Sequence, residues 1–195
     1  IISSRAAYLS GAFVDEQFEF VGKQLSGIPQ LKERWKRGVG LVEELIGEAA
    51  GQLYVEKHFP PSSKDTMLEL VQYLIRAYRE RISKLAWMSE PTKDKAQEKL
   101  AQFTSKIGYP DRWRSYAGLE FSDSGAKLVD NVRAGAAFEH DYQLSKIGQP
   151  SDRGEWVSSP QTVNAFYNPV VNDITFPAAI LQPPFFDPSA DAAEN

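Results

Sequence analysis

The stretch from Val163 to Phe186 constrains the fold most. It reads VNAFYNPVVNDITFPAAILQPPFF and carries two apolar runs around a turn, a Pro-Pro corner and almost no charge. Its alternation and its turn residues predict two strands of a hairpin, over 162–167 and 173–176. A short hairpin with little charge exposes an edge that invites another chain to pair with it. One use of such an edge is to bind an extended peptide as an added strand, so the stretch suggests peptide recognition.

The chain before this stretch follows the helical period. About five helices are predicted, over 4–25, 31–56, 62–88, from Pro91 to the stop at Gly108-Tyr109-Pro110, and 124–146. The clearest apolar stripe alternates spacings of four and three residues, and its members are Trp35, Val39, Val42, Ile46, Ala49 and Leu53. We therefore expect a mainly α fold of about five helices, followed by a C-terminal β-hairpin.

Composition divides the chain into four stretches. Residues 1–147 form the helical region, and 148–161 form a loop rich in Pro, Gly and Ser. The hairpin follows over 162–186, and residues 187–195 form a small, acidic and loose tail.

Charge and cysteine content exclude several classes of protein. The formal net charge is −4 with both signs interspersed, so the chain lacks the basic surface of a nucleic-acid binder. No apolar run reaches the length of a membrane span, and we expect no membrane contact from this segment. The absence of Cys excludes disulfides and thiolate chemistry, and it is compatible with both a reducing compartment and the periplasm.

The residues themselves predict no catalytic group and no metal site. A catalytic zinc site needs three protein ligands and an open position. The only two His residues, His58 and His140, are far apart in sequence, and a surface or capping role is expected for both. Glu44 and Glu48 share a helical face, which is typical of a solvated surface.

Short blocks spread through most of the chain carry a resemblance to a known family. They are Gly51-Gln52-Leu53-Tyr54-Val55, Trp87-Met88, Ile107-Gly108-Tyr109-Pro110, Asp152-Arg153-Gly154-Glu155-Trp156 and Pro160-Gln161-Thr162. The most specific blocks are Val163-Asn164-Ala165-Phe166-Tyr167 and the run from Phe176 to Phe186. Together they resemble the neprilysin and endothelin-converting-enzyme family of zinc metallopeptidases, on its bacterial oligopeptidase branch.

This resemblance implies a metalloendopeptidase that cuts short peptides. In the family, the stretch like Asn164-Ala165 is an edge strand beside the zinc, where the Asn side chain and the Ala backbone hydrogen-bond the substrate. Positions like Ile180 and Phe185 line the apolar pocket for the residue after the scissile bond. The helices would belong largely to a cap that encloses a cavity and admits only small peptides.

The zinc motif of the family is absent from this sequence. The H-E-x-x-H helix and the downstream Glu do not occur, so the resemblance implies the non-catalytic N-terminal part of a peptidase, ending before that motif. We expect zinc in the full-length enzyme and none in this chain, which alone should hydrolyse nothing. The expected partners are a peptide substrate, the missing C-terminal catalytic segment and a second copy bound through the apolar face of the hairpin.

The residue types taken alone leave other interpretations open. Asn164 also suits a strand-end Asn that bonds its own backbone. Ile180 and Phe185 also suit an ordinary core. The whole chain also suits a non-catalytic helical protein–protein interaction module, whose hairpin docks a partner strand.

Overall fold

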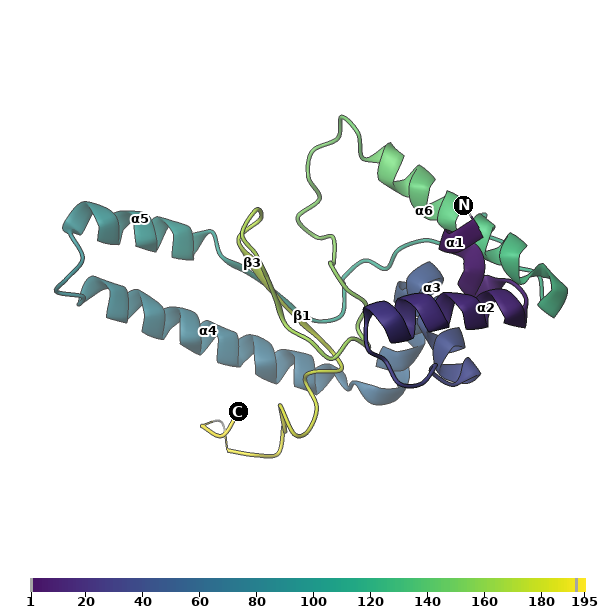
Figure 1. Ribbon diagram of the computed structural model, residues 1–195. Coiled ribbons are helices and arrows are strands. Elements are labelled where there is room, and N and C mark those ends of the chain that lie inside the picture. The colour runs from purple at the N-terminus through teal and green to yellow at the C-terminus, as the bar shows by residue number, and fades with distance from the viewer. Residues whose placement is uncertain (1, 192) are drawn as a thin grey trace. The chain divides into compact units, whose positions relative to one another are not determined.

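The computed structural model describes residues 2–191 and 193–195, which form two compact units. The first unit comprises Ile1–Gly47 and Ser115–Ser151, and the second comprises Glu48–Arg114 and Asp152–Asn195. Figure 1 labels the helices and strands of both. The predicted mainly α fold with a C-terminal hairpin is confirmed.

The first unit is helical. Its elements are α1 (Ile2–Arg5), η1 (Ala6–Tyr8), α2 (Gly11–Gln17), the π-helix η2 (Phe18–Leu25), the first part of α3 (Arg34–His58), η3 (Gly125–Lys127) and α6 (Leu128–Ser145). The single helix predicted over 4–25 is therefore several short pieces. Ser10 has an extended backbone, with ψ 161°, directly before α2 begins at Gly11. An extended residue interrupts the ladder of helical hydrogen bonds, so the apolar period continues across a break in the helix.

Close packing between α3 and α6 organises this unit. Val132 on α6 is buried, and a Cβ added at Gly135 would lie 2.8 Å from the Cδ2 atom of Leu45. The glycine therefore lets the two helices approach at this point. Within α3, Ile46 departs from helical geometry with φ −143° and ψ 35°.

The second unit contains a helical hairpin and a small sheet. Its elements are the last part of α3, α4 (Pro61–Ser83), α5 (Glu90–Ala101), β1 (Thr104–Gly108), β2 (Phe166–Asn168) and β3 (Asp173–Pro177). The helices α4 and α5 lie side by side and run in opposite directions (Figure 1). Each carries a proline in its first turn, where the missing N–H costs no intrahelical hydrogen bond.

The sheet has the order β1-β3-β2. β1 pairs with β3 in parallel, with Thr104 opposite Asp173 and Ile107 opposite Phe176, whereas β2 pairs with β3 in the antiparallel sense. β1 was not predicted, because Ile107 continues the apolar stripe of the preceding helix and its partner strand is distant in sequence. Helix α5 in fact ends at Ala101.

The core of the second unit joins the helices to the sheet. Its buried members are Val55, Phe59, Met67, Val71, Ile107, Ala178, Leu181 and Phe186. Gly108, at the end of β1, has a left-handed φ of 77°, and a Cβ added there would lie 2.6 Å from Cε1 of Phe59. Burying a side chain such as Phe186 stabilises the fold by about 1.5–3 kcal/mol.

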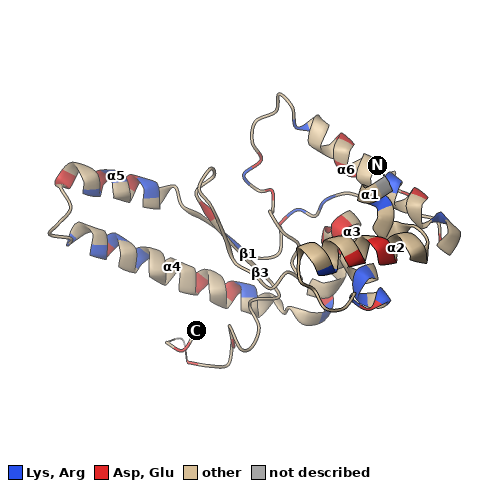
Figure 2. Cartoon of the chain, viewed as in Figure 1, with Lys and Arg blue, Asp and Glu red and all other residues tan. Residues whose placement is uncertain are grey.

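The surface carries both signs of charge. Figure 2 shows Lys and Arg interspersed with Asp and Glu along α4 and α5. Within the described residues, none of the helices has the length and apolar character needed to cross a bilayer.

Candidate functional site

The hairpin places a strand at the edge of the sheet. β2 pairs with β3 on one side, and no other strand of the described residues pairs with its second side. Backbone groups on such a side can hydrogen-bond an extended chain. The hairpin is not isolated, however, because the unpredicted β1 covers the other edge of β3.

Asn164 and Ala165 immediately precede β2 and are exposed. The backbone N–H of Ala165 donates to Oδ1 of Asn164 at 2.8 Å, and the N–H of Asn164 donates to the carbonyl of Thr162 at 3.1 Å. The self-bonded arrangement that the residue types suggested is therefore present. It leaves the Nδ2 amide of Asn164 and the carbonyl of Ala165 as the groups through which these two residues could pair with a peptide.

Ile180 and Phe185 lie in different surroundings. Ile180 is half-buried and packs against the core of the second unit, whereas 62% of Phe185 is exposed. Phe186, by contrast, is almost fully buried. Of the three large apolar residues near the Pro-Pro corner, Phe185 is therefore the one most accessible to a ligand.

A glutamine anchors the segment that carries these residues. Gln182 donates from Nε2 to the hydroxyl of Tyr54 at 2.8 Å, and Tyr54 itself lies on α3. The ring of Tyr54 is 5.1 Å from that of His58, centroid to centroid. This contact ties the corner before Phe185 to the end of α3.

A buried ion pair joins the two parallel strands on one face of the sheet. Nζ of Lys106 in β1 lies 2.5 Å from Oδ2 of Asp173 in β3, and both side chains are largely buried, with 12% and 2% exposed. The same ammonium group donates to the carbonyl of Glu155 at 2.7 Å. Two charge-assisted contacts of Lys106 therefore hold β1 against β3 and against the loop before the hairpin.

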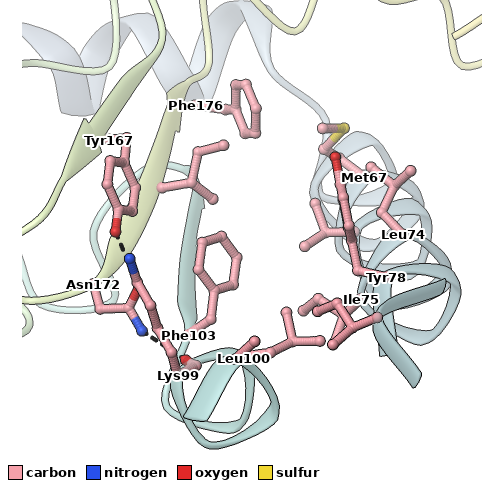
Figure 3. Close-up of a pocket in the computed structure, with 14 residues that line it drawn as sticks. Met67, Leu74, Ile75, Tyr78, Lys99, Leu100, Phe103, Tyr167, Asn172 and Phe176 are labelled. Carbon is pink, nitrogen blue, oxygen red and sulfur yellow. Dashed lines mark hydrogen bonds between the residues drawn. The ribbon is translucent and has the colours of Figure 1, made fainter. Parts of the chain in front are cut away.

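Asn172 links the hairpin turn to helix α5. Its Nδ2 donates to the carbonyl of Lys99 at 2.9 Å, its Oδ1 accepts from the hydroxyl of Tyr167 at 3.2 Å, and its own carbonyl accepts from the N–H of Thr104 at 3.2 Å. Figure 3 shows the two side-chain bonds. Asn172 is also the one non-glycine residue with a positive φ, 54°, in the part of the chain that the structure describes.

The opposite face of the sheet looks onto an apolar groove of about 700 Å³. Figure 3 shows side chains of α4, α5 and the hairpin converging on it. Most of its lining is aliphatic or aromatic, including Leu74, Ile75, Tyr78, Phe103, Ile174 and Phe176. Its polar members Lys99, Tyr167 and Asn172 are engaged with one another at the rim.

The described residues hold no metal-binding cluster. No group of three or more His, Cys, Asp or Glu side chains is placed to bind an ion within 2–191 and 193–195. His58 and His140 are both exposed. The donor set that a zinc site requires is therefore not provided by this part of the chain.

Sequence reasoning missed Lys106, Asp173 and Asn172. The ion pair depends on the parallel pairing of strands that are 69 residues apart, from Thr104 to Asp173, which no local pattern reveals. Asn172 did carry a local signal, because Asn between two apolar runs is among the few residues that adopt a left-handed backbone.

Comparisons with known proteins agree with this architecture. Two family models, both described as "Peptidase family M13", match this chain, one over residues 1–110 and the other over residues 164–195. The chain is 37% identical over 186 residues to a neutral endopeptidase of Lactobacillus helveticus, covering 95% of this chain and 29% of that protein. It is 35% identical over 170 residues to mouse neprilysin, covering 84% and 23%.

Solved structures give the same result. The zinc metalloprotease Zmp1 of Mycobacterium tuberculosis, in complex with an inhibitor, has a TM-score of 0.89 and 52% identity, over 98% of this chain and 28% of that one. PepO of Lactobacillus rhamnosis HN001 has a TM-score of 0.84 and 32% identity, over 97% and 30%. The chain thus spans less than a third of the length of these relatives, and by sequence and by fold it belongs to peptidase family M13, the neprilysin family.

Proposed function

We propose that this chain is part of a zinc-dependent endopeptidase that hydrolyses peptide bonds in short peptides. In that enzyme it supplies cavity-forming helices and the substrate-binding edge strand, while zinc and the catalytic groups are held by other parts of a polypeptide of the relatives' length. The observation that carries the proposal is the open side of β2, preceded by the exposed pair Asn164 and Ala165, in a member of family M13.

The proposed binding mode follows from the groups that remain at this edge. The N–H of Ala165 is occupied by Oδ1 of Asn164 at 2.8 Å. The Nδ2 amide of Asn164 then donates to a carbonyl of the substrate, and the carbonyl of Ala165 accepts from an N–H of the substrate. One donor and one acceptor fix an extended backbone in direction and register, which positions a peptide bond for attack.

Phe185 extends this proposal to a substrate side chain. Its exposed ring, together with the half-buried side chain of Ile180, offers apolar contact to the residue that follows the scissile bond. Such contact favours large apolar side chains at that substrate position, because each buried methylene contributes about 0.8 kcal/mol.

The groove indicates a second role for the same unit. Its 700 Å³ volume is lined almost entirely by apolar side chains, and removing such side chains from water is favourable. The polar groups at its rim already bond one another, so they do not converge on a small ligand. We propose that the remaining part of the family-length polypeptide covers the groove. If that part is absent, we expect the chain to self-associate through the groove.

The test is Asn164→Ala in the family-length enzyme. Loss of one hydrogen bond to the substrate backbone lowers kcat/KM about ten- to a hundredfold, while the midpoint of thermal unfolding stays within about 2 °C because the side chain is exposed. An unchanged kcat/KM would exclude a role of Asn164 in substrate binding. Binding of a protein partner along β2, with no peptidase activity in the family-length protein, would instead favour a non-catalytic interaction module.

A further inference from the structure

We propose that Asn172 is a positioning residue that holds the substrate-binding strand in place by capping helix α5. This inference rests on the proposed function of Asn164 and Ala165. It assigns to Asn172 no contact with the substrate: Asn172 acts through β2, whose first residue, Phe166, follows Ala165 directly.

The strand itself is too short to fix its own position. β2 has three residues, and its register with β3 comprises only Phe166, Tyr167 and Asn168. Strand pairs this small are marginally stable without further packing. The place of Asn164 and Ala165 must therefore be set largely by what holds the turn between β2 and β3.

Asn172 connects that turn to three other elements. Its side chain donates to the carbonyl of Lys99 in the last turn of α5 at 2.9 Å. Its Oδ1 accepts from Tyr167 in β2 at 3.2 Å, and its carbonyl accepts from Thr104 at the start of β1 at 3.2 Å. One residue thus joins α5, β1 and β2, as Figure 3 shows for the side-chain contacts.

The contact with α5 is a hydrogen bond to a carbonyl at the C-terminal end of the helix, where such donors are needed. The last four carbonyls of a helix lack intrahelical partners and carry the negative end of its dipole. The carbonyl of Lys99 accepts from the backbone N–H of Gln102 at 3.2 Å, and the Nδ2 amide adds a second donor from a residue 73 positions away in sequence. Nζ of Lys99 lies 6.0 Å from the centroid of the Tyr167 ring, which adds a second contact between α5 and β2.

The backbone of Asn172 makes the residue difficult to replace. Its φ of 54° lies in the left-handed region, which only Gly, Asn and Asp visit routinely. Of these, Gly has no side chain, and Asp would place a carboxylate against the carbonyl of Lys99. Asn is therefore the residue that satisfies both the turn and the helix end.

The experiment is a double-variant cycle in the family-length enzyme. Asn172→Gly keeps the turn conformation and removes both side-chain bonds, and we expect it to lower kcat/KM about tenfold. In the Asn164→Ala background the same change should lower kcat/KM less than about threefold, because the group that it positions is gone. Asn172→Asp should resemble Asn172→Gly, since it loses the donor to α5.

Two control variants separate positioning from stability. Gln97→Ala removes a side-chain amide bond of α5 that does not involve the hairpin, from Nε2 of Gln97 to the carbonyl of Arg79 in α4 at 2.8 Å, and should change kcat/KM less than about twofold. Val132→Ala removes buried methyl groups in the first unit and should lower the unfolding midpoint without changing kcat/KM.

Hydrogen exchange provides a readout that needs no substrate. Asn172→Gly should accelerate amide exchange in residues 163–168, and Gln97→Ala should not. Equal effects of Asn172→Gly in both backgrounds, or unchanged exchange in 163–168, would overturn the inference. If Asn164→Ala alone leaves kcat/KM unchanged, the proposed function fails, and the exchange result still decides whether Asn172 holds β2.

Discussion

Gly108 offers a sharp test of how the sheet is joined to the core. Its φ of 77° is left-handed, and a Cβ added to it would lie 2.6 Å from Cε1 and 3.1 Å from Cζ of Phe59. Phe59 is 4% exposed and stands edge-on to Tyr109. Gly108→Ala therefore introduces two separate costs, one from the backbone and one from packing.

Gly118 is a matched control, because it isolates the first cost. Its φ is 85°, and nothing lies within 4 Å of an added Cβ. A left-handed alanine costs about 1–2 kcal/mol, offset by about 0.4–1 kcal/mol through the lower entropy of the unfolded chain. We expect Gly118→Ala to destabilise by about 0–1.5 kcal/mol. Gly108→Ala adds about 1–3 kcal/mol of overpacking against the Phe59 ring, giving about 1–4.5 kcal/mol.

The assay is urea unfolding followed by circular dichroism. Gly108 belongs to the second unit and Gly118 to the first, so the two variants should move different transitions if the units unfold separately. In a Phe59→Leu background, Gly108→Ala should cost about as much as Gly118→Ala, because the ring is gone. Equal costs for the two glycines in the original background would refute the packing argument.

Two further predictions concern buried and titrating groups. Lys106→Met should destabilise by about 3–5 kcal/mol, because it leaves the carboxylate of Asp173, 2% exposed, without its cation. The double variant with Asp173→Leu should be more stable than that single variant in urea, and a less stable double variant would contradict a paired site. For Tyr8, burial, followed by the charge and the hydrogen bond of Glu44, raises the pKa above its ordinary value of 10.0. Its contribution to stability is complete below pH 10.0 and is lost as the pH rises through the higher folded-state pKa. Ultraviolet titration of tyrosinate should show the late-titrating group disappear in Tyr8→Phe, and an unchanged curve would exclude this assignment.

Local patterns predicted the elements whose packing is local. The helix predicted over 62–88 is α4, which begins one residue earlier at Pro61 and ends at Ser83. Pro91, the predicted start of the next helix, lies in the first turn of α5. The helix predicted over 4–25 is wrong in detail, because an amphipathic period does not reveal a short extended break, here at Leu9 and Ser10.

Elements that depend on distant partners were not predictable in this way. In the sequence, residues 104–108 follow the apolar pattern of a helix end. In the structure they form β1, with Ile107 opposite Phe176. At the site, sequence patterns and the resemblance identified Asn164 and Ala165 beside an edge strand, whereas the Lys106–Asp173 pair and the α5 contact of Asn172 exist only after the strands have met. The substrate-binding roles of Asn164, Ala165, Ile180 and Phe185 stay predictions.

The parallel pairing of β1 with β3 also implies an order of folding. The hairpin of β2 and β3 closes over a few residues, and such hairpins form within about 1–10 μs. β1 and β3 are separated by 69 positions, counted from Thr104 to Asp173, and the intervening chain includes Ser115–Ser151, which belongs to the other unit. Closing a loop of this length carries an entropic cost that local contacts do not repay. The hairpin should therefore form early in folding and pair with β1 late, after Ser115–Ser151 has folded with the other unit.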